Sequence, residues 1–262
     1  MAVAQRPAFQ EWTRTRDLLL ELIARDIKLR YRGSLLGILW TLLNPIAELV
    51  VLYLVFSTVL RVDIPHFPAY LFTGLIVYGW FQTSVHFATG AVVANRELVR
   101  RPGVSVVILP IVTVASNLVH FLLSLPILLA LLLISHLSLT TAALALPLLV
   151  VVQFGLILGC AYLVATINVW FRDTQHVLRI GLQLLFYLTP VFYETSAVPA
   201  ALQWWYRLNP MAHLVGAYRA ILMGGEVPAA HSLLYLVFVA GALLVAGLTW
   251  FRRASDRFAD EL

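Results

Sequence analysis

Three long stretches of the sequence contain no charged side chain. Residues 64–95, 102–171 and 227–251 lack Asp, Glu, Lys and Arg throughout. A helix that crosses a bilayer needs about 20 consecutive apolar residues. The middle stretch of 70 residues therefore accommodates two crossings, and each of the other two accommodates one.

We predict six membrane-spanning helices in an all-α integral membrane protein. The long middle stretch divides at the polar cluster of residues 135–141, which is typical of a turn. The fifth crossing is the shortest, because only 14 residues separate Arg179 from Glu194. The expected spans are residues 35–60, 68–94, 104–134, 141–169, 175–193 and 231–251.

Residues 11–32 have the pattern of an amphipathic helix on the membrane surface. Leu20, Ile23, Ile27 and Tyr31 recur at helical spacing on one face. Such a helix places its apolar face in the lipid interface. A soluble helix that docks on a cytoplasmic partner fits the same pattern. The opposing face carries Asp17, Glu21, Arg25, Lys28 and Arg32.

The connection between the fifth and sixth crossings, residues 194–231, is too apolar for a solvated loop. We expect short helices that enter the interface or re-enter the bilayer, with Trp204, Trp205 and Tyr206 at head-group level. The chain thus divides into a cytoplasmic or interfacial N-terminal helix (residues 1–32), a six-helix transmembrane domain (residues 33–251) and a cytoplasmic tail (residues 252–262).

The positive charges set the expected orientation. With the N-terminus inside, 15 of the 18 Lys and Arg residues lie on the inner side, and Arg61, Arg207 and Arg219 lie on the outer side. This bias predicts that both termini are cytoplasmic. It also accounts for the net charge of +5 without a nucleic-acid partner.

The composition excludes the soluble classes of protein. Apolar side chains make up 61% of the chain and charged ones 12%, which is unlike a soluble globular domain. The single Cys160 rules out an intrachain disulfide. Since the first 32 residues contain no uninterrupted apolar core of a cleavable signal peptide, we expect the N-terminus to remain in the mature protein.

Several crossings carry polar side chains at helical spacing. In lipid, such a face needs protein or a water-filled path beside it. Glu48 is either a functional group or a buried structural acid. Interhelical seams are the alternative, favoured for the third span and for Gly155 and Gly159. The three stripes are Gly37, Thr41, Asn44 and Glu48; Gly79, Gln82, His86 and Gly90; and Thr113, Ser116, His120 and Ser124.

Aromatic residues are plentiful in the crossings. Their faces suit the apolar CH faces of sugar rings and let a chain slide past. Core filling and interfacial belts explain most of the same residues without a ligand. The candidate substrate path combines polar and aromatic positions: Asn44, Glu48, Tyr53, Phe56, Trp80, His86, Phe186 and Tyr187.

The sequence offers no enzyme motif. It has no H-E-x-x-H, no Cys/His metal spacing and no G-x-S-x-G. Lys28 is the only lysine, and a phosphate-binding loop would require glycine where Leu22 and Ile27 stand. We therefore expect a non-enzyme with no metal or cofactor of its own. Any ATP that drives it would be bound by another polypeptide.

The chain also carries three motifs that are spread over its length. One opens the transmembrane domain, one joins the fourth and fifth spans, and one precedes the last span. They are residues 25–40 (RDIKLRYRGSLLGILW) running into Asn44-Pro45, residues 168–173 (NVWFRD) leading to residues 188–193 (LTPVFY), and residues 208–211 (LNPM) followed by Tyr218-Arg219.

In order, spacing and total length, these motifs resemble the permease subunits of bacterial type-2 ABC exporters, which export lipid-linked O-antigen, capsular polysaccharide and teichoic acid. The resemblance implies a homodimer in the bacterial cytoplasmic membrane, joined to two copies of a separate P-loop ATPase that binds ATP and Mg²⁺. It also implies an aromatic-lined channel between the protomers for a lipid-linked glycan. The motif places Arg25, Asp26, Lys28, Arg30 and Arg32 on the interfacial helix.

Two cytoplasmic connections are candidates for coupling to the ATPase. The main one, residues 95–102, is short, and Pro102 prevents the helix from continuing. Its ionised side chains offer charge-assisted contacts to a partner. Alternatively, the arginines only anchor the loop to anionic head groups. The candidate coupling residues are Arg96, Glu97, Arg100, Arg101, Arg172 and Asp173.

Two other classes of membrane protein remain open. A proton-coupled secondary transporter would use Glu48 with His86 or His120 as its relay. Inverted internal repeats would favour that class, and none is evident. A membrane-embedded transferase needs a base and a positioned nucleophile, which the spans do not offer.

Overall fold

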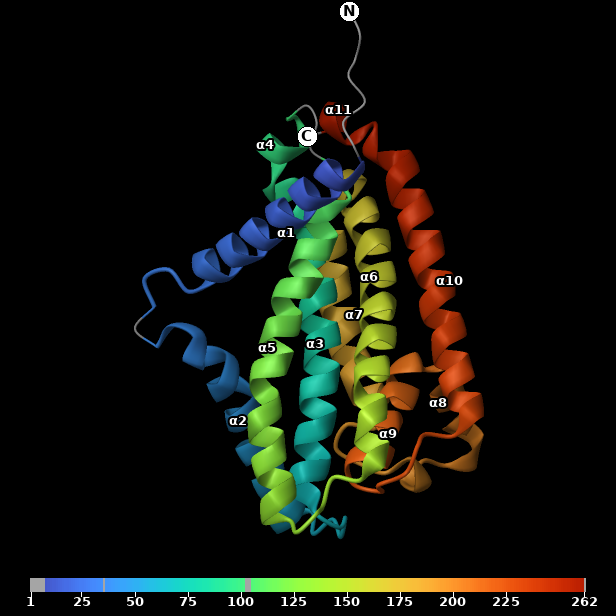
Figure 1. Ribbon diagram of the computed structural model, residues 1–262. Helices are drawn as coiled ribbons and strands as arrows, with labels where there is room; N and C mark the ends of the chain where they lie inside the picture. Colours follow the sequence, from blue (N-terminus) through green and yellow to red (C-terminus); the bar gives the residue numbers. More distant parts are fainter. Residues whose placement is uncertain (1–7, 35, 102–104, 262) are drawn as a thin grey trace, which may run out of the picture.

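The computed structural model describes residues 8–34, 36–101 and 105–261, and all regular secondary structure in these residues is helical. Four long helices run side by side along the molecule (Figure 1). The central one contacts α5 and α6, and α10 packs along α6. This confirms the expected all-α architecture. The long helices are α3 (Phe67–Ala94), α5 (Ile108–Ile134), α6 (Leu146–Trp170) and α10 (Ala230–Ser255).

Within the described residues, four helical segments are long and apolar enough to cross a membrane. They are Trp40–Val59, Ile108–Ile134, Thr141–Trp170 and Ala230–Ser255, and each coincides with a predicted span. The central helix α3 is more polar, yet most of its residues are buried. Because neighbouring helices shield it, α3 can carry Thr, Ser, Gln and His side chains that a lipid-facing helix could not.

The fifth predicted span is shorter than the sequence suggests. The helix α7 (Thr174–Leu188) ends before Pro190 and thus before residue 193, the expected end of the span. The reason is local, because a proline pushes the preceding residue out of the helical region. Thr189 accordingly has an extended backbone with ψ 136°.

The first predicted span lies mostly outside the core of the single chain. It consists of η1 (Gly37–Leu39), α2 (Trp40–Tyr53) and a π-helical turn, η2 (Leu54–Val59). Only 6% of its most apolar stretch is buried. This helix therefore has a broad face that only lipid or another chain can cover.

The N-terminal helix α1 (Ala8–Arg30) crosses the end of α5 (Figure 1). Leu19, Leu22 and Ile23 pack on Ile108 and its neighbours. Of the predicted apolar stripe, Ile23, Ile27 and Tyr31 are half-buried, whereas Leu20 is 55% exposed. The half-buried face also includes Asp26 and Arg30, which a purely apolar pattern assigns to the solvent face.

The two helices α6 and α10 approach closely at paired glycines. A Cβ atom on Gly159 would lie 2.5 Å from the backbone carbon of Leu243, and Gly247 faces the Gly159 backbone in turn. By contrast, a Cβ on Gly155 would meet nothing within 4 Å. The prediction that these glycines let two helices pack closely is therefore confirmed for Gly159 and not for Gly155.

Short helices follow the end of α7. They are η4 (Thr195–Ala197), η5 (Ala200–Leu202), α8 (Gln203–Leu208) and α9 (Pro210–Leu222). Asn209 caps α9, because its side chain accepts a hydrogen bond from the Met211 amide at 2.9 Å. The same side chain donates to Thr189 Oγ1 at 3.0 Å, which ties α9 to the end of α7.

The last residues form part of the folded body. The helix α10 continues to Ser255, and α11 (Phe258–Glu261) then contacts α4 (Arg96–Val99) and α6. Phe258 is fully buried, with its ring 5.2 Å from that of Phe251 and 5.8 Å from that of Trp170. The segment predicted as a tail is therefore docked on the end of the bundle.

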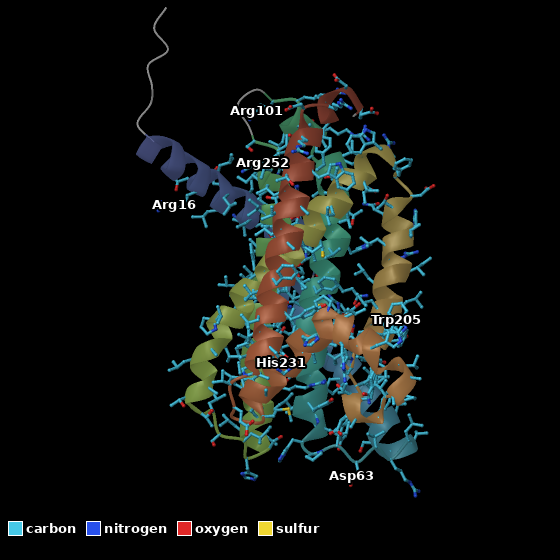
Figure 2. The ribbon with its side chains drawn as sticks, turned by 90° about the vertical axis from the view of Figure 1, so that its right-hand side faces the viewer. Arg16, Asp63, Arg101, Trp205, His231 and Arg252 are labelled. Atoms are coloured by element: carbon cyan, nitrogen blue, oxygen red, sulfur yellow. The ribbon has the colours of Figure 1, made fainter. Side chains whose placement is uncertain are left out.

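The two ends of the bundle differ in what they carry. The helices α1, α4 and α11 gather at one end (Figure 1). Arg16, Arg101 and Arg252 lie toward this end, and Asp63 lies at the opposite one (Figure 2).

Arg219 of α9 joins the short helices to the rest of the fold. It is 9% exposed, and within the described residues its guanidinium donates only to backbone carbonyl groups. Its guanidinium donates to the carbonyl oxygens of Pro190 and Val191, both at 2.6 Å, and to that of Tyr70 at 3.0 and 3.2 Å. It also lies over the Tyr70 ring, 3.3 Å from the centroid. From the sequence, we expect Arg219 to be one of three positive charges on the outer side of the membrane. The structure buries it in α9.

We predict that Arg219→Leu destabilises the protein strongly. It leaves three buried carbonyl groups without their donor, and each such loss costs about 1–3 kcal/mol. Thermal unfolding in detergent should therefore show a loss of about 3 kcal/mol or more. Arg207→Leu, at an exposed arginine of α8, is the control and should stay within about 0.5 kcal/mol of the parent. We call the contacts of Arg219 with the Tyr70, Pro190 and Val191 carbonyl groups the Arg219 clamp. Equal stability of the two variants would contradict a stabilising role for this clamp.

Candidate functional site

A cavity of about 440 Å³ opens between α1, α2, α3 and α5. Three of the predicted path residues, Asn44, Glu48 and Trp80, line it. The other polar groups on its wall come from all four elements. They are Arg30 and Tyr31 at the end of α1, Thr41 of α2, Gln82 and Thr83 of α3, and Asn117, His120 and Ser124 of α5.

The α2 wall of the cavity follows from helical spacing. Thr41, Asn44 and Glu48 are separated by three and four residues, so they share one face of α2. Neither Asn44 nor Glu48 is buried in the single chain. The predicted polar stripe of the first span is thus a cavity wall on the exposed side of the bundle.

Arg30 provides a cation at the α1 end of the cavity. Its Nη1 donates to Asn117 Oδ1 at 2.7 Å, and its Nη2 donates to Asp26 Oδ2 at 3.2 Å. The guanidinium also lies 4.5 Å from the centroid of the Phe87 ring. The sequence places Arg30 only on an interfacial helix. One sequence signal could have indicated its position: Asp26 and Arg30 are four residues apart, so they lie on the same face of α1, next to the apolar residues that pack on α5.

His120 lies beside this arginine, with its ring edge-on to Tyr31 at 5.7 Å. Both of its ring nitrogens are buried, and neither has a hydrogen-bond partner in the described part of the chain. His86 behaves differently, since it is absent from the cavity wall and its ring contacts that of Phe87 at 5.6 Å. Of the two histidines proposed as relay partners for Glu48, only His120 shares its cavity.

Trp80 has a mainly structural environment. It is 3% exposed, and its ring stacks on Phe121 at 5.0 Å. Its Nε1 donates weakly to the Val114 carbonyl oxygen at 3.5 Å. The edge of the ring that reaches the cavity is therefore held rigidly by the core.

Four of the remaining path residues, Tyr53, Phe56, Phe186 and Tyr187, belong to a separate aromatic cluster. Phe56 of η2 lies 4.9 Å from Phe192, which follows α7. Phe192 in turn contacts Phe186 at 5.8 Å and Tyr187 at 6.3 Å. Tyr53 reaches the cluster indirectly through Phe67, which contacts both Tyr53 and Phe56. The structure thus divides seven of the eight predicted path residues between the cavity and this cluster, and His86 lies in neither.

Exposure within the aromatic cluster is uneven. Tyr187 is 55% exposed and Tyr53 is 37% exposed, whereas Phe186 is buried. The two tyrosines therefore present ring surface beyond the single chain, and Phe186 fills the core behind them.

The predicted coupling residues lie on exposed connections. Arg96 and Glu97 belong to α4, and Arg100 and Arg101 follow it directly. Arg172 and Asp173 occupy the turn between α6 and α7. All six residues are exposed. Pro102 lies outside the described residues.

Metal binding finds no support in the described part of the chain. Those residues contain no group of three or more His, Cys, Asp or Glu side chains that could hold an ion.

Known proteins resemble this chain over nearly its whole length. The O-antigen export system permease protein RfbA of Myxococcus xanthus is 38% identical over 249 residues, which cover 94% of this chain and 96% of that protein. A protein of the same name from Klebsiella pneumoniae is 30% identical over 248 residues (94% and 95%). The polysialic acid transport protein KpsM of Escherichia coli is 28% identical over 249 residues (90% and 92%).

The profile of one transporter family matches residues 17–223. This range contains the cavity, the aromatic cluster and the Arg219 clamp. The motifs that suggested the resemblance also lie within it. The chain belongs to the ABC-2 type transporter family.

Proposed function

We propose that this chain is the transmembrane permease subunit of an ATP-driven exporter that moves a lipid-linked polysaccharide across the bacterial cytoplasmic membrane. The observation that carries the proposal is the nearly full-length similarity to permeases named for O-antigen export and polysialic acid transport. Two O-antigen permeases, at 38% and 30% identity, exceed the 28% of the polysialic acid transport protein, which favours a substrate of the O-antigen type over a capsule.

ATP hydrolysis is assigned to a separate subunit. The sequence has no phosphate-binding loop, since the residues that precede its only lysine lack the required glycines. We infer a homodimer of this chain with two copies of a P-loop ATPase that binds ATP and Mg²⁺. Family membership disfavours the proton-coupled alternative, although Glu48 and His120 share a cavity.

Six crossings are proposed for each subunit. The four apolar segments supply four of them. The 28 residues of α3 extend over about 42 Å, which exceeds the hydrocarbon core of about 30 Å. The 15 residues of α7 extend over only about 22 Å. We propose that α8 and α9 re-enter the membrane beside α7 and complete this side of the protein.

The proposed orientation places both termini in the cytoplasm, and we predict the sides of four marker positions. In a Cys160→Ser background, single cysteines at His66 and Ser138 should react with an impermeant thiol reagent added outside spheroplasts. Cysteines at Arg100 and Arg172 should react only after lysis. The physical reason is the bias of positive residues to the inner side. If a cysteine at position 100 reacts from outside and one at position 138 does not, the protein has the opposite orientation and the prediction is wrong.

Glycan movement is assigned to the exposed side of α2 and α7. Both helices leave broad apolar faces uncovered in the single chain. A second copy that faced them would enclose a path bordered by Glu48, Asn44, Tyr53 and Tyr187. Aromatic faces attract the CH faces of sugars without holding them in one position, which suits a chain that must slide.

The cytoplasmic connections are proposed to receive the motion of the ATPase. Arg100 and Arg101 are exposed directly after α4, and α11 packs against that helix. The double replacement Arg100→Lys and Arg101→Lys distinguishes contact with the ATPase from anchoring to lipid head groups. Lysine keeps the charge that attracts head groups, but it lacks the planar guanidinium that binds a carboxylate through two hydrogen bonds. Intact coupling in this variant would assign the arginines to membrane anchoring.

We predict that Tyr187→Ala slows polysaccharide export several-fold while leaving membrane insertion and the amount of protein unchanged. The ring is exposed beside the proposed path, so its loss removes a sliding contact without opening the core. The measurement is the rate at which glycan reaches the cell surface after export is induced. Phe238→Ala is the control, because Phe238 is 73% exposed on α10 and should face lipid. Equal export by both variants would remove Tyr187 from the path.

A further inference from the structure

The α1 end of the cavity holds hydrogen-bond donors that the sliding contacts of a glycan do not use. A guanidinium carries five N–H groups in a rigid fork. The contacts of Arg30 with Asn117 and Asp26 use two of them and fix the plane of the group. The remaining donors are available to a ligand in the cavity that Arg30 lines.

His120 supplies an independent indication of a ligand. Both ring nitrogens are buried and unpaired within the described residues, and leaving a buried polar group without a partner is unfavourable. Its neighbour Tyr31 contacts the ring by its edge and meets neither nitrogen along a hydrogen bond. A bound polar molecule would remove this cost. The imidazole and the guanidinium together favour an anion with several acceptor oxygens, which is the chemistry of a phosphate.

The far end of the cavity has the opposite character. Glu48 and Asn44 lie one to two turns further along α2 from Thr41. A carboxylate accepts hydrogen bonds, so it suits the hydroxyl groups of a sugar. The volume of about 440 Å³ is in the range of ordinary small-molecule sites. One cavity therefore offers donors at one end and acceptors at the other.

We propose that this cavity binds the head group of a glycosylated lipid phosphate, with the phosphate at Arg30 and His120 and the first sugar toward Glu48. The inference rests on the proposed function and assigns it a recognition site within each subunit. In the proposed orientation α1 lies at the cytoplasmic head-group level, which is where such a head group would enter. An ordinary membrane phospholipid carries the same phosphate and is the competing source.

Binding to the purified transporter, with its ATPase and without nucleotide, tests the site. The probes are a polyprenyl diphosphate that carries one hexose, the same lipid without sugar, and phosphatidylglycerol. Native mass spectrometry gives the dissociation constants. Arg30→Gln should weaken binding of both polyprenyl lipids roughly tenfold or more, because a hydrogen bond to a charged group is lost. Arg30→Lys, which keeps the charge, should lose less.

A matched control and a second variant separate the two ends. Arg32→Gln removes an exposed charge two residues away and should leave binding unchanged. Glu48→Gln should weaken the glycosylated lipid and spare the unglycosylated one. Equal losses in the Arg30 and Arg32 variants would overturn the phosphate assignment, as would binding that neither Arg30 variant alters.

The lipid source is decided by the same titrations. Retention of phosphatidylglycerol as tightly as the glycosylated lipid, and with the same dependence on Arg30, would overturn the assignment to a glycosylated lipid. Since binding is measured without ATP or export, its failure would remove this site and leave the proposed export function intact.

Discussion

The chain leaves its helical structure after α7, and this exposes carbonyl groups in a region where little water is available to pair with them. A bilayer tolerates irregular backbone only where protein or a water-filled cavity covers it. Arg219 meets this constraint by donating to Pro190, Val191 and Tyr70 at once. The charge is therefore an integral part of the fold, because its hydrogen bonds go to backbone carbonyl groups.

The position of the aromatic cluster depends on that clamp. Val191 precedes Phe192, the ring that contacts both Phe56 and Phe186. Fixing the Val191 carbonyl thus fixes the contact between η2 and the end of α7. At the end that we propose to be cytoplasmic, Arg30 plays a comparable role, because its bond to Asn117 holds the end of α1 against α5. The two arginines define the two ends of the surface that we propose to face the glycan.

Much of the helical layout could be predicted from the sequence, because uncharged stretches, Gly and Pro mark spans and breaks directly. Hydropathy does not locate the end of α7, because the apolar stretch continues through Pro190, whereas the proline forces Thr189 out of the helix. The hydropathy pattern could not predict the contacts of Arg30 and Arg219, because their hydrogen-bond partners lie 87 and up to 149 residues away in the sequence. The candidate path likewise mixes exposed rings such as Tyr187 with buried ones such as Trp80, and periodicity does not separate them.

The central claim is that this chain moves a lipid-linked polysaccharide across the cytoplasmic membrane. The most direct measurement deletes its gene in the native bacterium and quantifies two pools, the polysaccharide on the surface and the lipid-linked polysaccharide in the inner membrane. We expect the surface pool to disappear, the lipid-linked pool to accumulate on the cytoplasmic side, and the intact gene to restore both. An unchanged surface pool, or the loss of both pools together, would contradict the account.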